Sequence, residues 1–206
     1  GTFTCRSVDT LIALGSSGRS YSVAVSGLPG GRGDGAPMTS LIDLETGTQL
    51  LHYAAGPATQ GLVLAGSLGY GLLATIGDLS ASKRVGKTFL ALEKDELPLK
   101  PAKVDPKLPH LAVLSEEGLL LTFPVNELKL QPKGGRGLTL MDLDAKDRLL
   151  AVSCFATQLQ LSGIARGNKP KDDVLRLSGL AAHAGKRARK GKSIDGFKQV
   201  LTLRGE

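Results

Sequence analysis

Tryptophan is absent from this sequence of 206 residues, and five phenylalanines and three tyrosines supply all the large aromatic rings. Proteins that bind single-stranded nucleic acid stack the bases on aromatic side chains, so this composition disfavours that class. The only two cysteines, Cys5 and Cys154, are far apart, which favours a reduced compartment over a disulfide-rich fold. No apolar run approaches the ~18 residues that cross a bilayer, so we expect no membrane contact.

Long helical patterns are also missing, because no apolar pattern of helical period extends beyond about ten residues. The 27 glycines instead punctuate short runs rich in Thr, Val and Leu. This pattern predicts an all-β fold with few, short helices. The chain begins at Gly1 without methionine and at once alternates like a strand, so we expect one domain over 1–206 that is a fragment of a longer protein.

Clusters of catalytic or metal-binding residues are not found either. His52, His110 and His183 are scattered, without the spacing of metal ligands. The tyrosines lie in alternating stretches, where packing is the usual role. We therefore predict no catalytic residue, no metal site and no cofactor within this chain.

The positive charge of the chain is concentrated near its C-terminus. The formal net charge is +7, and residues 166–206 hold 11 Lys and Arg against four acids, whereas the first 165 residues hold 15 of each. A localised basic excess indicates a polyanionic partner, although basic tails can also be simply solvated.

Three stretches share one plan of strand, tight turn with glycine, and strand. They are LIALGSSGRSYSV at 11–23, LVLAGSLGYGLLA at 62–74 and LAVLSEEGLLLTF at 111–123. Their turn glycines, Gly18, Gly69 and Gly118, are 51 and 49 residues apart, a period typical of propeller blades. We expect approximate repeats over 11–56, 62–104, 110–155 and 156–206.

A second glycine follows each hairpin and precedes another predicted strand, at Gly33, Gly86, Gly137 and, in a degenerate copy, Gly191. The loop before it is basic in every copy. A single such loop is ordinarily a solvated turn, but its recurrence favours a function. The candidate binding residues are Arg32, Lys83, Arg84, Lys87, Lys133, Arg136, Lys186, Arg187, Arg189, Lys190 and Lys192.

Duplex DNA fits this pattern better than a small substrate. Equivalent loops of stacked repeats fall at equivalent radius, so the cations would form one belt. Phosphates recur every ~1.7 Å along the duplex, and a row of cations can neutralise many of them without reading sequence. Glycines beside the cations would let backbone N–H groups reach phosphate oxygens. A propeller-like scaffold that binds an acidic protein is the alternative.

Several motifs resemble the C-terminal domain of the A subunit of bacterial type IIA topoisomerases, specifically topoisomerase IV. They are GRSYSV at 18–23, LGYGLLATIGDLSASKRVGKTFLAL at 68–92, LLLTFPVNEL at 119–128, GGRGLTLMDL at 134–143 and GKRARKGKSIDGFKQVLTL at 185–203. The resemblance implies a β-pinwheel of about four to five four-stranded blades, in which neighbours exchange strands and the ring is open or broken.

The resemblance also implies a function and partners. The domain would bind and bend duplex DNA, and guide it for ATP-dependent strand passage (decatenation and supercoil relaxation) by the catalytic core of the same polypeptide. In the full enzyme, the ATPase B subunit would be a partner, and ATP and Mg would act through other domains. The protein would be bacterial, cytoplasmic and chromosome-associated.

The gyrase A protein is similar in fold and is an open alternative. Its C-terminal domain wraps DNA with a box, Q-R/K-R-G-G-R/K-G, that Gln131, Lys133, Gly134, Gly135, Arg136 and Gly137 fit. Pro132 stands where the box has a basic residue, and the other loops are more degenerate. This departure favours topoisomerase IV.

Overall fold

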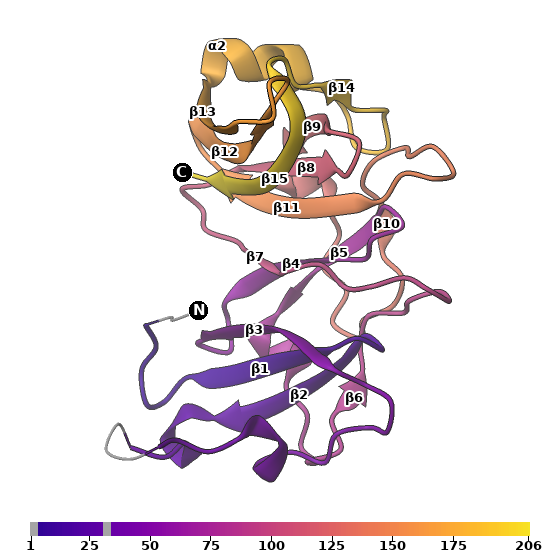
Figure 1. Ribbon diagram of the computed structural model, residues 1–206. Helices are drawn as coiled ribbons and strands as arrows, with labels where there is room; N and C mark the ends of the chain where they lie inside the picture. The colour runs from indigo at the N-terminus through magenta and orange to yellow at the C-terminus, as the bar shows by residue number, and fades with distance from the viewer. Residues whose placement is uncertain (1–3, 31–33) are drawn as a thin grey trace.

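The computed structural model describes residues 4–30 and 34–206, and these residues form fifteen strands in four small sheets, or blades (Figure 1). Three blades have four strands and the fourth has three, which confirms the all-β prediction. All the pairings between these strands are antiparallel.

Each blade is built on a hairpin. The hairpins are β1 (Thr10–Gly15) with β2 (Arg19–Ala24), β4 (Gly61–Ala65) with β5 (Tyr70–Thr75), β8 (His110–Ser115) with β9 (Leu119–Pro124), and β12 (Gln158–Ala165) with β13 (Pro170–Arg176). A later strand of the same repeat pairs with the first hairpin strand. These later strands are β3 (Leu50–Gly56), β7 (Ala102–Lys103), β11 (Leu149–Phe155) and β15 (Phe197–Gly205).

The outer strand of the first three blades comes from the following repeat. β6 (Lys87–Thr88) pairs with β2, β10 (Leu138–Thr139) pairs with β5, and β14 (Lys192–Ser193) pairs with β9. This is the strand exchange that the pinwheel prediction requires. A backbone amide just after each exchanged strand also donates a hydrogen bond to the carbonyl of a hairpin-turn glycine. The donor and acceptor pairs are Leu90 with Gly18, Leu140 with Gly69, and Ile194 with Gly118.

The hairpin turns explain the first set of glycines. Gly18, Gly69 and Gly118 have φ values of 76°, 95° and 81°, in the left-handed region that glycine adopts without strain. In the fourth blade the equivalent position is Asn168, with φ of 58°, and its amide closes the turn on Ala165. Asparagine tolerates this region better than most residues, so the fourth hairpin keeps the period without glycine.

The first copy corrects one expectation. A strand was expected after Gly33, but residues Met38–Ser40 form a 3₁₀ turn, η2, and Gly33 itself lies outside the described residues. The equivalent segments of later repeats become strands by pairing with the preceding blade. The first repeat has no preceding blade in this chain, so its segment lacks the edge that would make it a strand.

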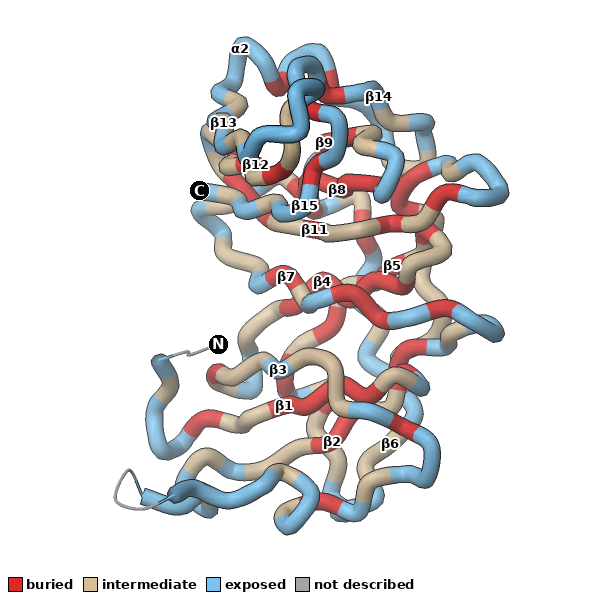
Figure 2. The backbone as a smooth tube through the Cα atoms, in the orientation of Figure 1, coloured by how far each residue is buried: buried red, intermediate tan, exposed pale blue. Residues whose placement is uncertain are grey.

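The core lies between the blades and not within one central cluster. Along β8, Leu111 and Val113 pack against the second blade, whereas Ala112 and Leu114 pack against the fourth. Successive residues of a strand point to opposite faces, so a strand buried on both faces is apolar throughout. Figure 2 shows the resulting buried stretches in the middle of the stack.

Short helical segments complete the repeats. They are α1 (Ile76–Leu79), α2 (Leu177–Leu180), η1 (Val25–Gly27), η3 (Val125–Glu127) and η4 (Ala181–His183). The first and fourth blades lie at opposite ends of the stack in Figure 1, and no strand pairing joins them among the described residues. The ring is therefore open.

Candidate nucleic-acid interface

Three basic loops lead into the three exchanged strands. We call them loop 1 (82–86), loop 2 (131–137) and loop 3 (185–191), and they precede β6, β10 and β14. In Figure 1 these three strands lie on one side of the stack, and the two chain ends lie on the other. Strand exchange therefore brings the basic loops of successive repeats to a common edge.

The glycine that ends each loop allows the exchanged strand to approach the preceding hairpin. A Cβ atom at Gly137 would lie 2.1 Å from the carbonyl oxygen of Gly71 in β5, and one at Gly86 would lie 2.3 Å from that of Ser20 in β2. At Gly191 the nearest atoms would be at 3.0–3.1 Å and belong to Met141, Leu119 and Leu120. The recurrence of these glycines thus follows from the packing of exchanged strands.

The sequence predicted that backbone N–H groups of the loops would be free to bind phosphate, but three of these groups donate hydrogen bonds within the protein. The N–H groups of Gly86 and Gly134 donate to carbonyls of their own loops, and that of Gly135 donates to Phe89. These groups are occupied by the fold, so the expectation that they reach phosphate oxygens is wrong for them. The bond from Gly135 joins loop 2 to the preceding repeat, whereas the bonds from Gly86 and Gly134 close turns within their own loops.

Each loop also docks on the preceding repeat through its carbonyls. The amides of Asp43, Ala91 and Asp142 donate to the carbonyls of Arg84, Gly135 and Arg189. Beside each docking point a cation of the loop meets a carboxylate of the preceding repeat. The pairs are Arg84 with Asp43 at 3.3 Å, Arg136 with Glu93 at 2.9 Å, and Lys190 with Asp144 at 2.7 Å.

Three of the predicted binding residues therefore have partners within the protein. Arg136 is the most enclosed of them, because it also lies 3.6 Å from Glu96 and stacks on the ring of Tyr70 at 4.1 Å. The hydrogen bond and charge of Asp144 raise the pKa of Lys190. A role for these three cations in holding neighbouring repeats together follows directly from these contacts.

Two further candidates also contact the protein. Arg187 donates from its guanidinium to the carbonyl of Thr139, and its backbone amide donates to Glu127 at 2.9 Å. Lys87 places its ammonium 5.6 Å from the centre of the Phe89 ring. Arg32 lies outside the described residues.

The remaining candidates are exposed, and their side chains form no ion pair with the described part of the chain. They are Lys83 in loop 1, Lys133 in loop 2, Lys186 and Arg189 in loop 3, and Lys192 in β14. Each loop thus presents at least one cation to solvent beside a cation that is paired. We call these five residues the exposed belt.

A second repeating set of residues was missed by the sequence analysis. Glu45, Glu96 and Asp147 are 51 residues apart, and each carboxylate accepts a hydrogen bond from the hairpin turn of its own blade. The donors are the hydroxyl of Ser17 at 3.0 Å, the amide of Leu68 at 3.2 Å and the amide of Glu117 at 3.2 Å. The regular interval of these acids was the signal that could have revealed them.

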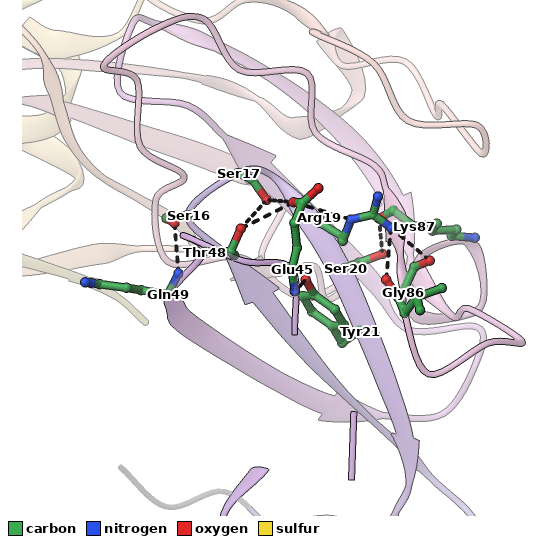
Figure 3. A network of polar contacts seen from close by, with 11 residues as sticks. Ser16, Ser17, Arg19, Ser20, Tyr21, Glu45, Thr48, Gln49, Gly86 and Lys87 are labelled. Carbon is green, nitrogen blue, oxygen red and sulfur yellow. Dashed lines mark hydrogen bonds and ion pairs between the residues drawn. The ribbon is translucent and has the colours of Figure 1, made fainter. Parts of the chain in front are cut away.

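Figure 3 shows this arrangement in the first blade. Glu45 contacts the hydroxyls of Ser17 and Thr48, and Arg19 lies 3.6 Å from the same carboxylate. The guanidinium of Arg19 also donates to the carbonyls of Val85 and Gly86 at the end of loop 1. The acid therefore connects the hairpin turn to the basic loop of the next repeat.

Comparisons with known proteins agree with this geometry. The sequence profile described as "DNA gyrase C-terminal domain, beta-propeller" matches residues 62–97 and 109–156. The A subunit of DNA topoisomerase 4 from Neisseria gonorrhoeae is 35% identical over an alignment of 185 residues, and this alignment covers 86% of this chain and 23% of that protein. The Escherichia coli ParC C-terminal domain superposes with a TM-score of 0.84 at 25% identity, covering 96% of this chain and 81% of that one. The chain belongs to the family of gyrase A and topoisomerase IV A C-terminal domains.

Members of this family differ in their structural similarity and sequence identity to this chain. The DNA gyrase A C-terminal domain superposes with a TM-score of 0.72 at 17% identity, over 96% of this chain and 66% of that one, a likeness of fold alone. The chain spans about a quarter of the length of the curated topoisomerase IV proteins that it matches. The β-pinwheel expected from the sequence motifs is confirmed.

The described residues contain neither a candidate metal site nor a helix suited to span a membrane. In the described ranges, 4–30 and 34–206, no three His, Cys, Asp or Glu residues gather in a way that suits a metal ion. No helix within these ranges has the length and hydropathy needed to cross a membrane.

We expect His183 to make the stability of this pinwheel pH-dependent. The residue is buried beside β9 and β14, and burial lowers its pKa below the ordinary value of about 6.5. The unfolded chain then binds a proton that the folded chain does not, so the free energy of unfolding falls as pH drops below about 6.5, by at most ~1.4 kcal/mol per pH unit. Urea denaturation at pH 7.5 and 5.5 measures this loss.

A variant separates His183 from His52, whose pKa burial also lowers. His183→Asn should lose less stability between the two pH values than the wild-type protein, whatever its stability at pH 7.5. An unchanged pH dependence in the variant would exclude His183 as the source.

Proposed function

We propose that this domain binds duplex DNA along the exposed belt without reading its sequence. The observation that carries the proposal is the presentation of solvent-exposed cations by three successive repeats at one edge of an open stack. Cations that neutralise phosphates supply affinity but no sequence discrimination. Lys83, Lys133 and Lys186 would bind one segment from consecutive blades.

Bending of the duplex is part of the proposal. Non-specific binding with a Kd of ~10⁻⁴ to 10⁻⁶ M is worth roughly 5 to 8 kcal/mol. Bending 20 to 30 base pairs by 40 to 90° costs roughly 1 to 6 kcal/mol. The belt can therefore sustain a modest bend, and it should lose this bend as salt rises.

The wider role follows from the family. The relatives include the A subunits of topoisomerase IV, so the domain would guide DNA toward the catalytic core of its own polypeptide in a cytoplasmic bacterial enzyme. The ATPase B subunit, ATP and Mg would belong to other parts of that enzyme. The 35% sequence identity to a topoisomerase IV A subunit favours this assignment over a gyrase domain that wraps DNA tightly. The presence of Pro132 in loop 2 favours it as well.

The test compares two variants that remove the same charge. In the belt variant, Lys83, Lys133 and Lys186 become Ala. In the matched control, three exposed cations remote from the loops, Lys100, Lys103 and Arg204, become Ala. Affinity for a duplex of 30 base pairs is measured by fluorescence anisotropy over a range of salt concentrations.

The belt variant should flatten the dependence of log K on log salt by about three, because each lost phosphate contact contributes ~0.9. The control should keep a slope close to that of the wild-type protein. Two duplexes of unrelated sequence should bind equally. Equal slopes for the two variants would refute the belt, and failure of the wild-type protein to bind duplex would refute the function.

A further inference from the structure

A cavity of about 540 Å³ opens between the second, third and fourth blades. Its walls come from β7 and the residues on either side of it, from β11 and from the last residues of β15. The C-terminal end of β15 lies on the opposite side of Figure 1 from β10 and β14. The cavity is thus separate from the exposed belt, and no step of the proposed DNA binding uses it.

Three cations line this cavity, Lys100 and Lys103 from the second blade and Arg204 from the fourth. None of the lining residues is acidic, and no ion pair to these cations occurs within the described ranges. Like charges that converge without a counter-ion repel one another. The fold therefore brings three cations without ion-pair partners in the described ranges to the meeting point of three blades.

Three acids lie near these cations in sequence or influence them by charge, and each accepts a hydrogen bond from another group. Asp105, two residues after Lys103, accepts from the backbone amide of Lys107 at 2.8 Å. Asp9, whose pKa Lys103 helps to lower, is bound by the backbone amide of Arg6 at 2.7 Å and by its guanidinium at 3.1 Å. Glu206 accepts hydrogen bonds from the side chains of Gln158 and Gln160. None of these acids forms an ion pair with the three cations in the described ranges, so the cavity has room for an external anion as their partner.

The walls also set the size and character of that anion. A cavity of this volume is within the range of about 300 to 1,000 Å³ that holds small molecules. Beside the cations it is lined by Ala102, Leu108, Val152 and Leu203, which offer apolar surface. We propose that this cavity is a binding site for a small organic diphosphate, whose phosphates contact Lys100, Lys103 and Arg204.

The test uses inorganic pyrophosphate as the probe, without Mg²⁺, and follows the backbone amides of the ¹⁵N-labelled chain by NMR. Pyrophosphate should shift the amide signals of Ala102, Ser153 and Gly205 with a saturating dependence on concentration. Replacement of Lys100, Lys103 and Arg204 by Ala should weaken this binding at least about tenfold. The belt variant, which loses the same charge, should change it less than about threefold.

Two outcomes would overturn the proposal. One is the absence of saturable shifts at the cavity, and the other is equal weakening by the two variants, which would indicate attraction to net charge alone. Because the three cations are exposed, their replacement should leave the fold intact, and the dispersion of the amide spectrum checks this. Arg204→Gln alone should weaken pyrophosphate binding as well, which keeps the test valid if the triple variant unfolds.

Discussion

Gly137→Ala is expected to destabilise the domain by about 4 kcal/mol or more, among the largest effects of a single substitution. The backbone at Gly137 has φ of 85°, which costs an L-residue about 1 to 2 kcal/mol. In addition, the new Cβ would lie 2.1 Å from the carbonyl oxygen of Gly71. Backbone atoms cannot yield as a flexible side chain can, so β10 would have to leave β5.

Gly118→Ala is the matched control. Its φ of 81° is nearly the same, but no atom lies within 4 Å of the position that a Cβ would take. This variant should lose only the conformational cost of about 1 to 2 kcal/mol. Urea denaturation followed by circular dichroism measures both. Equal losses for the two glycines would contradict the role given to strand exchange.

Glu96→Ala should destabilise the domain by about 3 kcal/mol. Glu96 is 4% exposed, and its carboxylate accepts hydrogen bonds from the amides of Leu68 at 3.2 Å and Glu93 at 2.9 Å. Removal would leave two backbone donors without a partner and would take a counter-charge from Arg136. Thermal and urea denaturation of the purified variant test this prediction.

Glu93→Ala provides the comparison within the same cluster. The side chain of Glu93 is 65% exposed, and its carboxylate contributes the ion pair with Arg136. An exposed pair is worth less than about 1 kcal/mol, so this variant should be far milder. If Glu93→Ala proved as damaging as Glu96→Ala, the hairpin-turn contacts would not be what makes Glu96 important.

The sequence predicted the repeating hairpins because a local signal encodes them. Gly18, Gly69 and Gly118 each occupy a left-handed turn between two apolar strands, so spacing and residue type coincide. The fourth hairpin lacks this signal because Asn168 stands where the other three turns have glycine. The pairing of β6, β10 and β14 with the preceding blade is non-local, and it was expected from the family resemblance and not from the spacing of residues.

The sequence predicted which loops are basic but not which of their cations are paired within the protein. Counting cations identified the basic loops, yet Arg84, Arg136 and Lys190 face carboxylates 41, 43 and 46 residues earlier in the chain. A charge run does not reveal which of its members is paired, because that depends on the neighbour that folding brings. The regular spacing of Glu45, Glu96 and Asp147 was visible but had no meaning until the turns were placed.

The central claim is that cations from successive repeats meet one DNA segment along one edge. Lysine acetylation with and without a 30-base-pair duplex, read by mass spectrometry, tests it directly in the unaltered protein. Duplex should slow the acetylation of Lys83, Lys133, Lys186 and Lys192, and leave that of Lys100, Lys103 and Lys107 unchanged. Equal protection of both groups, or protection of the second group alone, would contradict the account.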